Sequence, residues 1–207
     1  EDLKVDYDLK RMTESQRRAW QAYYQPMSED FKRQNLSGKA LDEWKFQRYM
    51  NDYLGCVLSL DRNIGRLLNY LDEQKLSENT VVIYASDQGF YLGEHGWFDK
   101  RFMYEESEHM PFLMRYPKLI KPGTRVNELL MGIDFAPTFL DLAGAEIPRD
   151  IQGKSILPLL RKKRSKDWRQ QVYYHYYEKA EHNVMKHFGI RTKRYKLIRF
   201  YGEGDFW

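Results

Sequence analysis

Cysteine is almost absent from this chain of 207 residues, and so are long apolar runs and a strong excess of either charge. The single cysteine, Cys56, excludes an intrachain disulfide and any metal site built from several cysteines. It stands in an apolar helical stretch, which predicts a buried and inert thiol. No stretch approaches the ~20 apolar residues of a membrane-spanning helix. A net charge of +4 is too small to indicate nucleic-acid binding.

The first residues lack a methionine and the pattern of a signal peptide, since the chain opens on Glu1-Asp2-Leu3-Lys4. We therefore expect the sequence to belong to a longer protein. What it does contain is apolar and aromatic residues. Hydrophobic residues make up 42% of the chain, which is enough for a packed core and excludes a disordered tail.

Two helices are expected in the first third of the chain. Residues 13–36 are polar with scattered aromatics and predict a helix, or a helix broken near Pro26. From Phe46 to Leu71, apolar residues recur at steps of three and four, which predicts one face of a long amphipathic helix with Ser37 as its N-cap.

The hydrophobic pattern then changes. Residues 81–85 form a continuous run of β-formers, which is typical of a strand buried on both faces in a parallel sheet. A second such run covers residues 111–116, and a third short strand is expected around Val126. Residues 134–144 predict a compact helix with Asp134 as N-cap and Gly144 at its left-handed end.

Together these elements predict an α/β fold with a mostly parallel central sheet over residues 1–160. The basic run 161–166 indicates a linker. Three strand-like segments follow, and they predict a small antiparallel α+β subdomain over residues 161–207 that is incomplete at its end: 172–177, 186–191 and 195–200.

The densest set of chemical groups lies in residues 86–100, at the carboxyl end of a predicted strand, where open α/β sheets bind their ligands. Asp87 and Gln88 offer oxygen donors of the kind that Ca²⁺ or Mg²⁺ prefers, whereas His95 would suit only a softer metal. A simple turn after the strand explains Asp87-Gln88-Gly89 equally well, because Asp and Gly are common turn residues.

This segment resembles a conserved block of the type I sulfatases, which belong to the alkaline phosphatase superfamily. The resemblance covers most of the chain and is carried by Ser86-Asp87-Gln88-Gly89, Leu92-Gly93-Glu94-His95-Gly96, Lys100, Met110-Pro111-Phe112, Ile133-Asp134-Phe135-Ala136-Pro137-Thr138 and Gln152-Gly153-Lys154-Ser155. It implies an alkaline-phosphatase-like sandwich in which Asp87 and Gln88 bind Ca²⁺. It also implies that Lys100 holds the substrate sulfate and stabilises charge on the leaving oxygen.

The resemblance also has departures. It places His95 in the loop, where we expect it to order the loop rather than transfer protons, because the family's general-acid histidine lies upstream. Glu108 and His109 stand where relatives often carry leucine and arginine. The formylglycine motif Cys/Ser-x-Pro-x-Arg does not occur, and Cys56 is followed by Val57-Leu58.

The nucleophile and further Ca²⁺ ligands are therefore expected in a missing N-terminal half. Two ligands make an incomplete Ca²⁺ site, so this chain alone is expected to be inactive.

The last part of the chain resembles bacterial sulfatases that act on sulfated glycans, particularly N-acetylglucosamine-6-sulfatases. This implies a sulfated sugar or glycosaminoglycan as substrate, with contacts from His95, Glu178, His182 and Arg191 in addition to Lys100. Glu178, His182 and Arg191 could equally decorate a solvated sheet face. The bacterial periplasm or cell surface is the expected location, with secretion or a lysosome-like compartment as alternatives.

Two other functions stay open. A phosphoryl-transfer enzyme of the same superfamily is one, although a two-metal phosphatase would use more histidines than His95. A non-catalytic module that binds sulfated glycans is the other.

Overall fold

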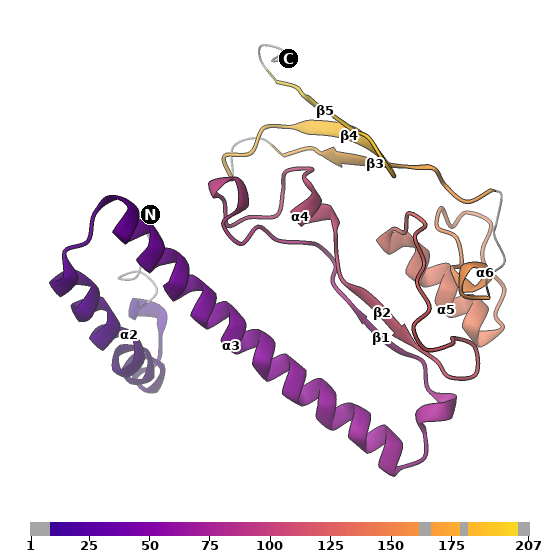
Figure 1. The fold of residues 1–207 in the computed structure, drawn as a ribbon, viewed down its shortest axis with the longest axis horizontal. Helices are drawn as coiled ribbons and strands as arrows, with labels where there is room; N and C mark the ends of the chain where they lie inside the picture. The colour runs from indigo at the N-terminus through magenta and orange to yellow at the C-terminus, as the bar shows by residue number, and fades with distance from the viewer. Residues whose placement is uncertain (1–8, 162–166, 179–181, 203–207) are drawn as a thin grey trace. The chain divides into compact units, whose positions relative to one another are not determined.

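The computed structural model describes residues 9–161, 167–178 and 182–202 (Figure 1). The chain divides into two compact units, Glu1–Leu58 and Ser59–Trp207, and each is described by itself. The domain boundary predicted at residue 160 stays a prediction. Apart from Arg161, the linker predicted over 161–166 lies outside the described residues.

Helix α2 (Glu14–Gln34) confirms the first predicted helix. It begins at a capping box in which the Thr13 amide donates to the Gln16 side chain at 2.9 Å and the Gln16 amide donates to Thr13 Oγ1 at 3.3 Å. Of the two alternatives, the unbroken helix is confirmed, because α2 continues through Pro26 despite the missing backbone donor. Phe31 packs against Trp44 of the next helix, with ring centroids 4.4 Å apart.

Helix α3 (Gly38–Glu73) confirms the long helix that the apolar periodicity predicts. None of its residues is fully buried, and apolar side chains such as Leu54 and Leu58 are about half exposed. The prediction of a buried Cys56 is wrong, because the thiol is exposed, on a helix in which no residue is fully buried. No described helix is long and apolar enough to cross a membrane.

The short helix η1 (Ser77–Asn79) leads into strand β1 (Val82–Ala85), which pairs with β2 (Phe112–Arg115). Both strands were predicted, but they run antiparallel, with Val82 opposite Arg115. Burial on both faces is wrong for β1, because a strand is enclosed only where other elements cover it and Tyr84 is 41% exposed.

The described residues thus have an α/β fold with small antiparallel sheets, and a parallel central sheet is not shown. The strand expected around Val126 is wrong, since this described segment is irregular.

A compact core follows the β1–β2 sheet. Helix η3 (Gly132–Asp134) leads into α5 (Phe135–Ala143), which ends at Gly144 with a φ of 68°, as predicted. The short helix α6 (Leu157–Leu160) supplies much of the buried cluster, whose members are Ile156, Leu157, Leu159, Leu160 and Trp168.

Asp134 is the N-cap residue of α5, as predicted, but its side chain makes no capping hydrogen bond to that helix. Its carboxylate is fully buried and accepts hydrogen bonds from the amides of Met131 at 2.8 Å and Lys154 at 2.9 Å. The Arg169 guanidinium donates to both of its oxygens, with Nη2 2.6 Å from Oδ1. A buried carboxylate requires such complete pairing, which a helix cap alone would not provide.

The remaining strands form an antiparallel sheet in the order β3 (Gln171–Tyr176), β4 (His187–Thr192) and β5 (Lys196–Phe200). The three strands were predicted, including the tight β4–β5 hairpin. The hairpin is closed by the Thr192 amide, which donates to the Tyr195 carbonyl at 2.7 Å. The second unit also contains two short helices. Helix η2 (Glu94–Gly96) lies within the segment 86–100, and α4 (Glu105–Glu108) follows that segment.

Candidate functional site

The candidate site begins where β1 ends. The Ser86 hydroxyl donates to the Gln88 carbonyl at 2.6 Å, which turns the chain away from the strand. The Asp87 carboxylate is exposed and Gln88 is partly buried. Among the described residues, neither side chain makes a hydrogen bond or ion pair, so both oxygen donors remain available to a ligand.

Gly89 fixes the motif against α4. Its amide donates to the Ser107 carbonyl at 2.9 Å. A Cβ at this position would lie 1.9 Å from the Glu106 carbonyl oxygen, well inside van der Waals contact. Glycine is therefore required here by the close approach of two backbones.

The segment after Gly89 is a loop that closes on itself. The Tyr91 amide donates to the Asp99 carbonyl at 2.7 Å, and the Gly93 amide donates to the Trp97 carbonyl at 2.9 Å. The fully buried Tyr91 donates its hydroxyl to the Phe102 carbonyl at 2.6 Å, and burial raises the pKa of this phenol. These bonds return the chain to the motif just before Lys100.

Lys100 is partly buried at this return point. Its ammonium makes no hydrogen bond or ion pair with any described residue. A lysine that is held by its backbone and has a free side chain is suited to binding an anion from outside the loop.

His95 lies at the exposed tip of the same loop, with a φ of 60°. Its Nε2 is 3.4 Å from Glu106 Oε2, and its ring lies 4.9 Å from the Tyr104 ring. Both contacts join the loop tip to α4 and its N-cap. They support the predicted ordering role, which stays a prediction.

The donor set fits part of a Ca²⁺ site. No cluster of three or more His, Cys, Asp or Glu able to hold a metal occurs in the described parts of the chain. Asp87 and Gln88 could supply two hard oxygen ligands, and Ca²⁺ takes about six to eight. These residues thus suit the ion chemically and leave most of its ligands to other groups.

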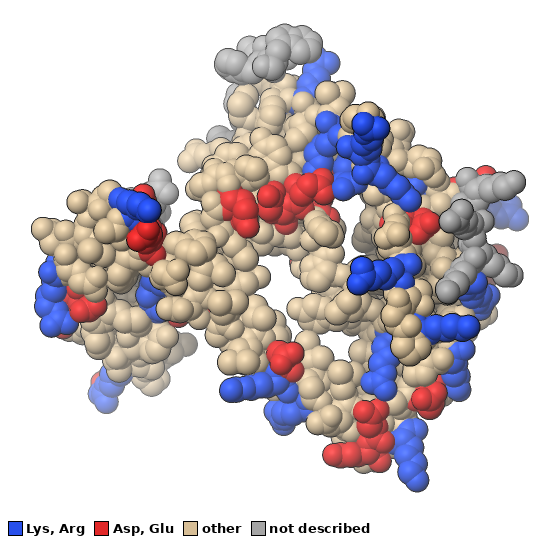
Figure 2. Space-filling view, in the orientation of Figure 1, with Lys and Arg blue, Asp and Glu red and all other residues tan. Residues whose placement is uncertain are grey.

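Helix α4 carries Glu105 and Glu108, which pair with cations of the C-terminal sheet. Red and blue groups lie next to one another in this part of the surface (Figure 2). Glu105 accepts from Arg191 Nε at 3.1 Å and Nη2 at 2.9 Å, and Lys196 Nζ lies 2.8 Å away. Hydrogen bonds from Arg191 lower the pKa of Glu105 to about 2. Lys196 also lies 2.7 Å from Glu108, whose pKa is raised by burial. This ionic cluster binds α4 to β4 and β5.

The predicted substrate residues fall in two places. Glu178 and His182 are exposed, with Oε2 and Nε2 4.0 Å apart, and residues 179–181 between them lie outside the description. Arg191 instead pairs with Glu105. No contact between described residues joins Glu178 or His182 to the Lys100 loop, so their substrate role stays a prediction.

Two residues that the sequence analysis missed tie the Lys100 loop to the sheet. The Tyr174 hydroxyl donates to the Arg101 carbonyl at 2.8 Å, and the Met103 amide donates to His187 Nε2 at 3.2 Å. His187 is fully buried among aromatic rings, and burial lowers its pKa. Alternation along β3 puts Tyr174 on the same face as Tyr176, which pairs with His187 of β4. The sequence shows the alternation but does not show which strands pair.

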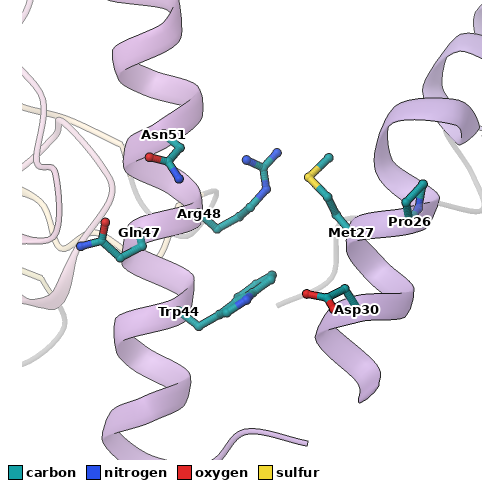
Figure 3. Close-up of a pocket in the computed structure, with 7 residues that line it drawn as sticks. All are labelled: Pro26, Met27, Asp30, Trp44, Gln47, Arg48 and Asn51. Atoms are coloured by element: carbon teal, nitrogen blue, oxygen red, sulfur yellow. The ribbon is translucent and has the colours of Figure 1, made fainter. Parts of the chain in front are cut away.

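A separate groove of about 360 Å³ lies between α2 and α3 in the first unit (Figure 3). Trp44 and Arg48 of α3 point toward Met27 of α2 across this space. None of the predicted site residues lines the groove.

Two protein families match the chain. The family described as Sulfatase matches residues 12–145, and the family described as N-sulphoglucosamine sulphohydrolase, C-terminal, matches residues 93–207. The segment from Gly93 to Lys100 lies within both matches.

Individual proteins are similar over most of the chain. It is 54% identical to the N-acetylglucosamine-6-O-sulfatase of Bacteroides thetaiotaomicron over 96% of this chain and 36% of that protein. A structure described as a complex with its substrate, D-glucosamine-2-N,6-O-disulfate, has a TM-score of 0.86 and 53% identity over 96% of this chain and 41% of that one. The structure of the phosphonate monoester hydrolase of Silicibacter pomeroyi has a TM-score of 0.64 and 29% identity, and the match covers 72% of this chain and 32% of that one. The chain thus spans little more than a third of the curated relative.

Proposed function

The chain belongs to the sulfatase family, and from this premise we propose that the whole protein removes sulfate from a sulfated sugar, with N-acetylglucosamine-6-sulfate as the expected substrate. The observation that carries the proposal is Lys100, whose ammonium makes no hydrogen bond or ion pair with a described residue and whose loop closes through the Tyr91–Asp99 backbone bond. The segment from residue 87 to residue 100 thus offers one free cation and the two free oxygen donors of Asp87 and Gln88 to a ligand.

Each of these side chains has a distinct task in the proposed reaction. The Lys100 ammonium binds a sulfate oxygen and stabilises the negative charge that develops on the leaving sugar oxygen as the S–O bond breaks. Asp87 and Gln88 would hold part of a Ca²⁺ site. When bound, Ca²⁺ supplies positive charge that draws the sulfate group and offsets its charge.

The nucleophile is proposed to come from a part of the protein that precedes this chain, because the chain has no Cys/Ser-x-Pro-x-Arg motif from which formylglycine could form. We propose the same source for the other Ca²⁺ ligands and for strands that would extend β1 into a parallel central sheet. The chain alone is accordingly proposed to be inactive.

Substrate choice is proposed to depend on Glu178 and His182, which are exposed and could donate to or accept from sugar hydroxyls. Arg191 remains a proposed substrate contact, although its guanidinium is engaged with Glu105. A sulfated glycan in the bacterial periplasm or at the cell surface is the proposed setting.

A phosphonate or phosphate ester is the second candidate substrate. The similarity to a phosphonate monoester hydrolase favours it, because the same lysine and metal ligands could bind a tetrahedral phosphorus group. The scarcity of histidines near Lys100 favours the sulfate ester, since a two-metal phosphatase would use more of them.

Replacing Lys100 tests the site directly. We expect Lys100→Ala in the whole protein to lower turnover of the sulfated sugar by ~10²–10³, as the loss of a group that stabilises transition-state charge often does. Lys121→Ala removes an exposed lysine outside the site and should leave turnover unchanged. Near-normal turnover in Lys100→Ala would reject the role given to this residue.

A further inference from the structure

Lys100 receives its direction from the backbone on either side of it. The Asp99 carbonyl accepts from the Tyr91 amide at 2.7 Å, and the Arg101 carbonyl accepts from the Tyr174 hydroxyl at 2.8 Å. The first bond comes from the start of the same loop. The second comes from β3, 73 residues further along the chain. Because no described residue contacts the Lys100 ammonium, these two bonds flank a side chain with no partner of its own.

The C-terminal sheet makes two further contacts just beyond Arg101. His187 of β4 accepts from the Met103 amide, and its Nδ1 lies 2.7 Å from the Met185 carbonyl. The Met185 contact requires the proton on Nδ1, which leaves Nε2 free to accept from Met103. A Cβ at Gly189 would lie 2.6 Å from Met103 Sδ, so the sheet surface is shaped to receive this side chain.

Among these contacts of the C-terminal sheet, the bond from Tyr174 reaches the backbone nearest to Lys100, at Arg101. Its hydroxyl is partly buried, and burial raises the phenol pKa, so the group remains a donor at neutral pH. Removing the hydroxyl would leave the ring in place and release only the Arg101 carbonyl. The Arg101–Phe102 peptide, one residue beyond Lys100, could then rotate and shift the backbone that carries Lys100, and small displacements of a catalytic group can lower a rate by up to ~10²-fold.

We propose that Tyr174 is a positioning residue for Lys100, which it serves by holding the Arg101 carbonyl against the C-terminal sheet. This inference rests on the proposed function, because it takes Lys100 as the group that binds sulfate. Through Tyr174, β3 would then help to position the lysine that acts in the sulfate-ester reaction, in addition to any contact that the sheet makes with the sugar.

The test is a double-mutant cycle in the whole protein with Tyr174→Phe and Lys100→Ala. Tyr174→Phe alone should lower kcat for sulfate release by on the order of 10-fold, because Lys100 is misdirected in the transition state. In the Lys100→Ala background, Tyr174→Phe should have almost no further effect, since the residue on which it acts is gone. Tyr173→Phe is the matched control, because it removes an exposed hydroxyl that contacts His175 on the same strand.

The outcomes separate the two claims. If Tyr174→Phe lowers kcat by the same factor with and without Lys100, the residue acts on general structure and the positioning role is wrong. Full activity in Tyr174→Phe would also overturn it. If Lys100→Ala itself retains activity, the proposed function of the lysine fails instead. Unfolding temperatures of all variants show whether a rate loss follows from a loss of folded protein.

Discussion

At the scale of single residues, Asp134 is a fully buried acidic residue that pairs with Arg169. Its carboxylate is fully buried, and Arg169 is itself 13% exposed. The two amides from Met131 and Lys154 complete the pairing. A buried ion pair of this kind joins η3, the segment before α6 and the start of the C-terminal sheet, so its loss would affect all three.

We expect Asp134→Asn to lower the free energy of unfolding by about 3–5 kcal/mol, because it leaves the Arg169 guanidinium buried without its counter-charge. Urea unfolding of the whole protein measures this. Asp150→Asn, at an exposed position, is the control and should change stability by less than about 0.5 kcal/mol. A loss from Asp134→Asn as small as that of the control would contradict the account of this pair.

Residue-level prediction from the sequence is possible where a motif concentrates its chemistry. Asp87, Gln88 and Lys100 could be singled out because they lie within fourteen consecutive positions after a predicted strand, and their roles stay predictions. Tyr174 was not singled out, because a tyrosine in a strand fits any sheet face and its partner carbonyl is distant in sequence. Asp134 was correctly placed at the N-cap of α5, but its pairing with Arg169 was missed, since a local pattern carries no information about a residue 35 positions away.

At the scale of elements, the central contact is that between α4 and the C-terminal sheet. Glu105 and Glu108 face Arg191 and Lys196, while Gly89 brings the end of β1 against the same helix. The helix has only four residues, so its position depends on these contacts rather than on its own stability.

The pKa of Glu105 makes this contact sensitive to acid. Its folded-state pKa of about 2 is below the ordinary 4.5, so its stabilising effect is present above about pH 4.5 and is lost as the pH falls toward 2. We expect the unfolding temperature of the whole protein to exceed that of Glu105→Gln at neutral pH, and the difference to shrink below about pH 4.5. Glu146→Gln, at an exposed position, should show no such trend. A difference that stays constant down to acid pH would exclude the Glu105 carboxylate as its source.

Elements themselves were more predictable than their pairing. Helical periodicity located α3, and runs of strand-forming residues located β1, β2 and the three strands of the C-terminal sheet, because both are local properties of the sequence. The antiparallel pairing of β1 with β2 was missed, because pairing direction depends on which strands are neighbours. The exposed Cys56 was missed for a similar reason, since an apolar helix face indicates burial without naming what covers it.

At the scale of the whole molecule, the proposed reaction needs groups that these 207 residues do not contain. The chain spans 36% of the similar N-acetylglucosamine-6-O-sulfatase, and it has no formylglycine motif. Its proposed contribution is the sulfate-binding lysine, two Ca²⁺ ligands and a C-terminal sheet that holds the lysine in place. The nucleophile is proposed to come from elsewhere in the protein.

The most direct measurement is product release by the whole protein from two matched substrates, N-acetylglucosamine-6-sulfate and N-acetylglucosamine-6-phosphate. The account predicts that inorganic sulfate is released and that kcat/KM for the sulfate ester exceeds that for the phosphate ester. Faster release of phosphate, or no release of sulfate from this sugar or from sulfated glycans, would contradict it.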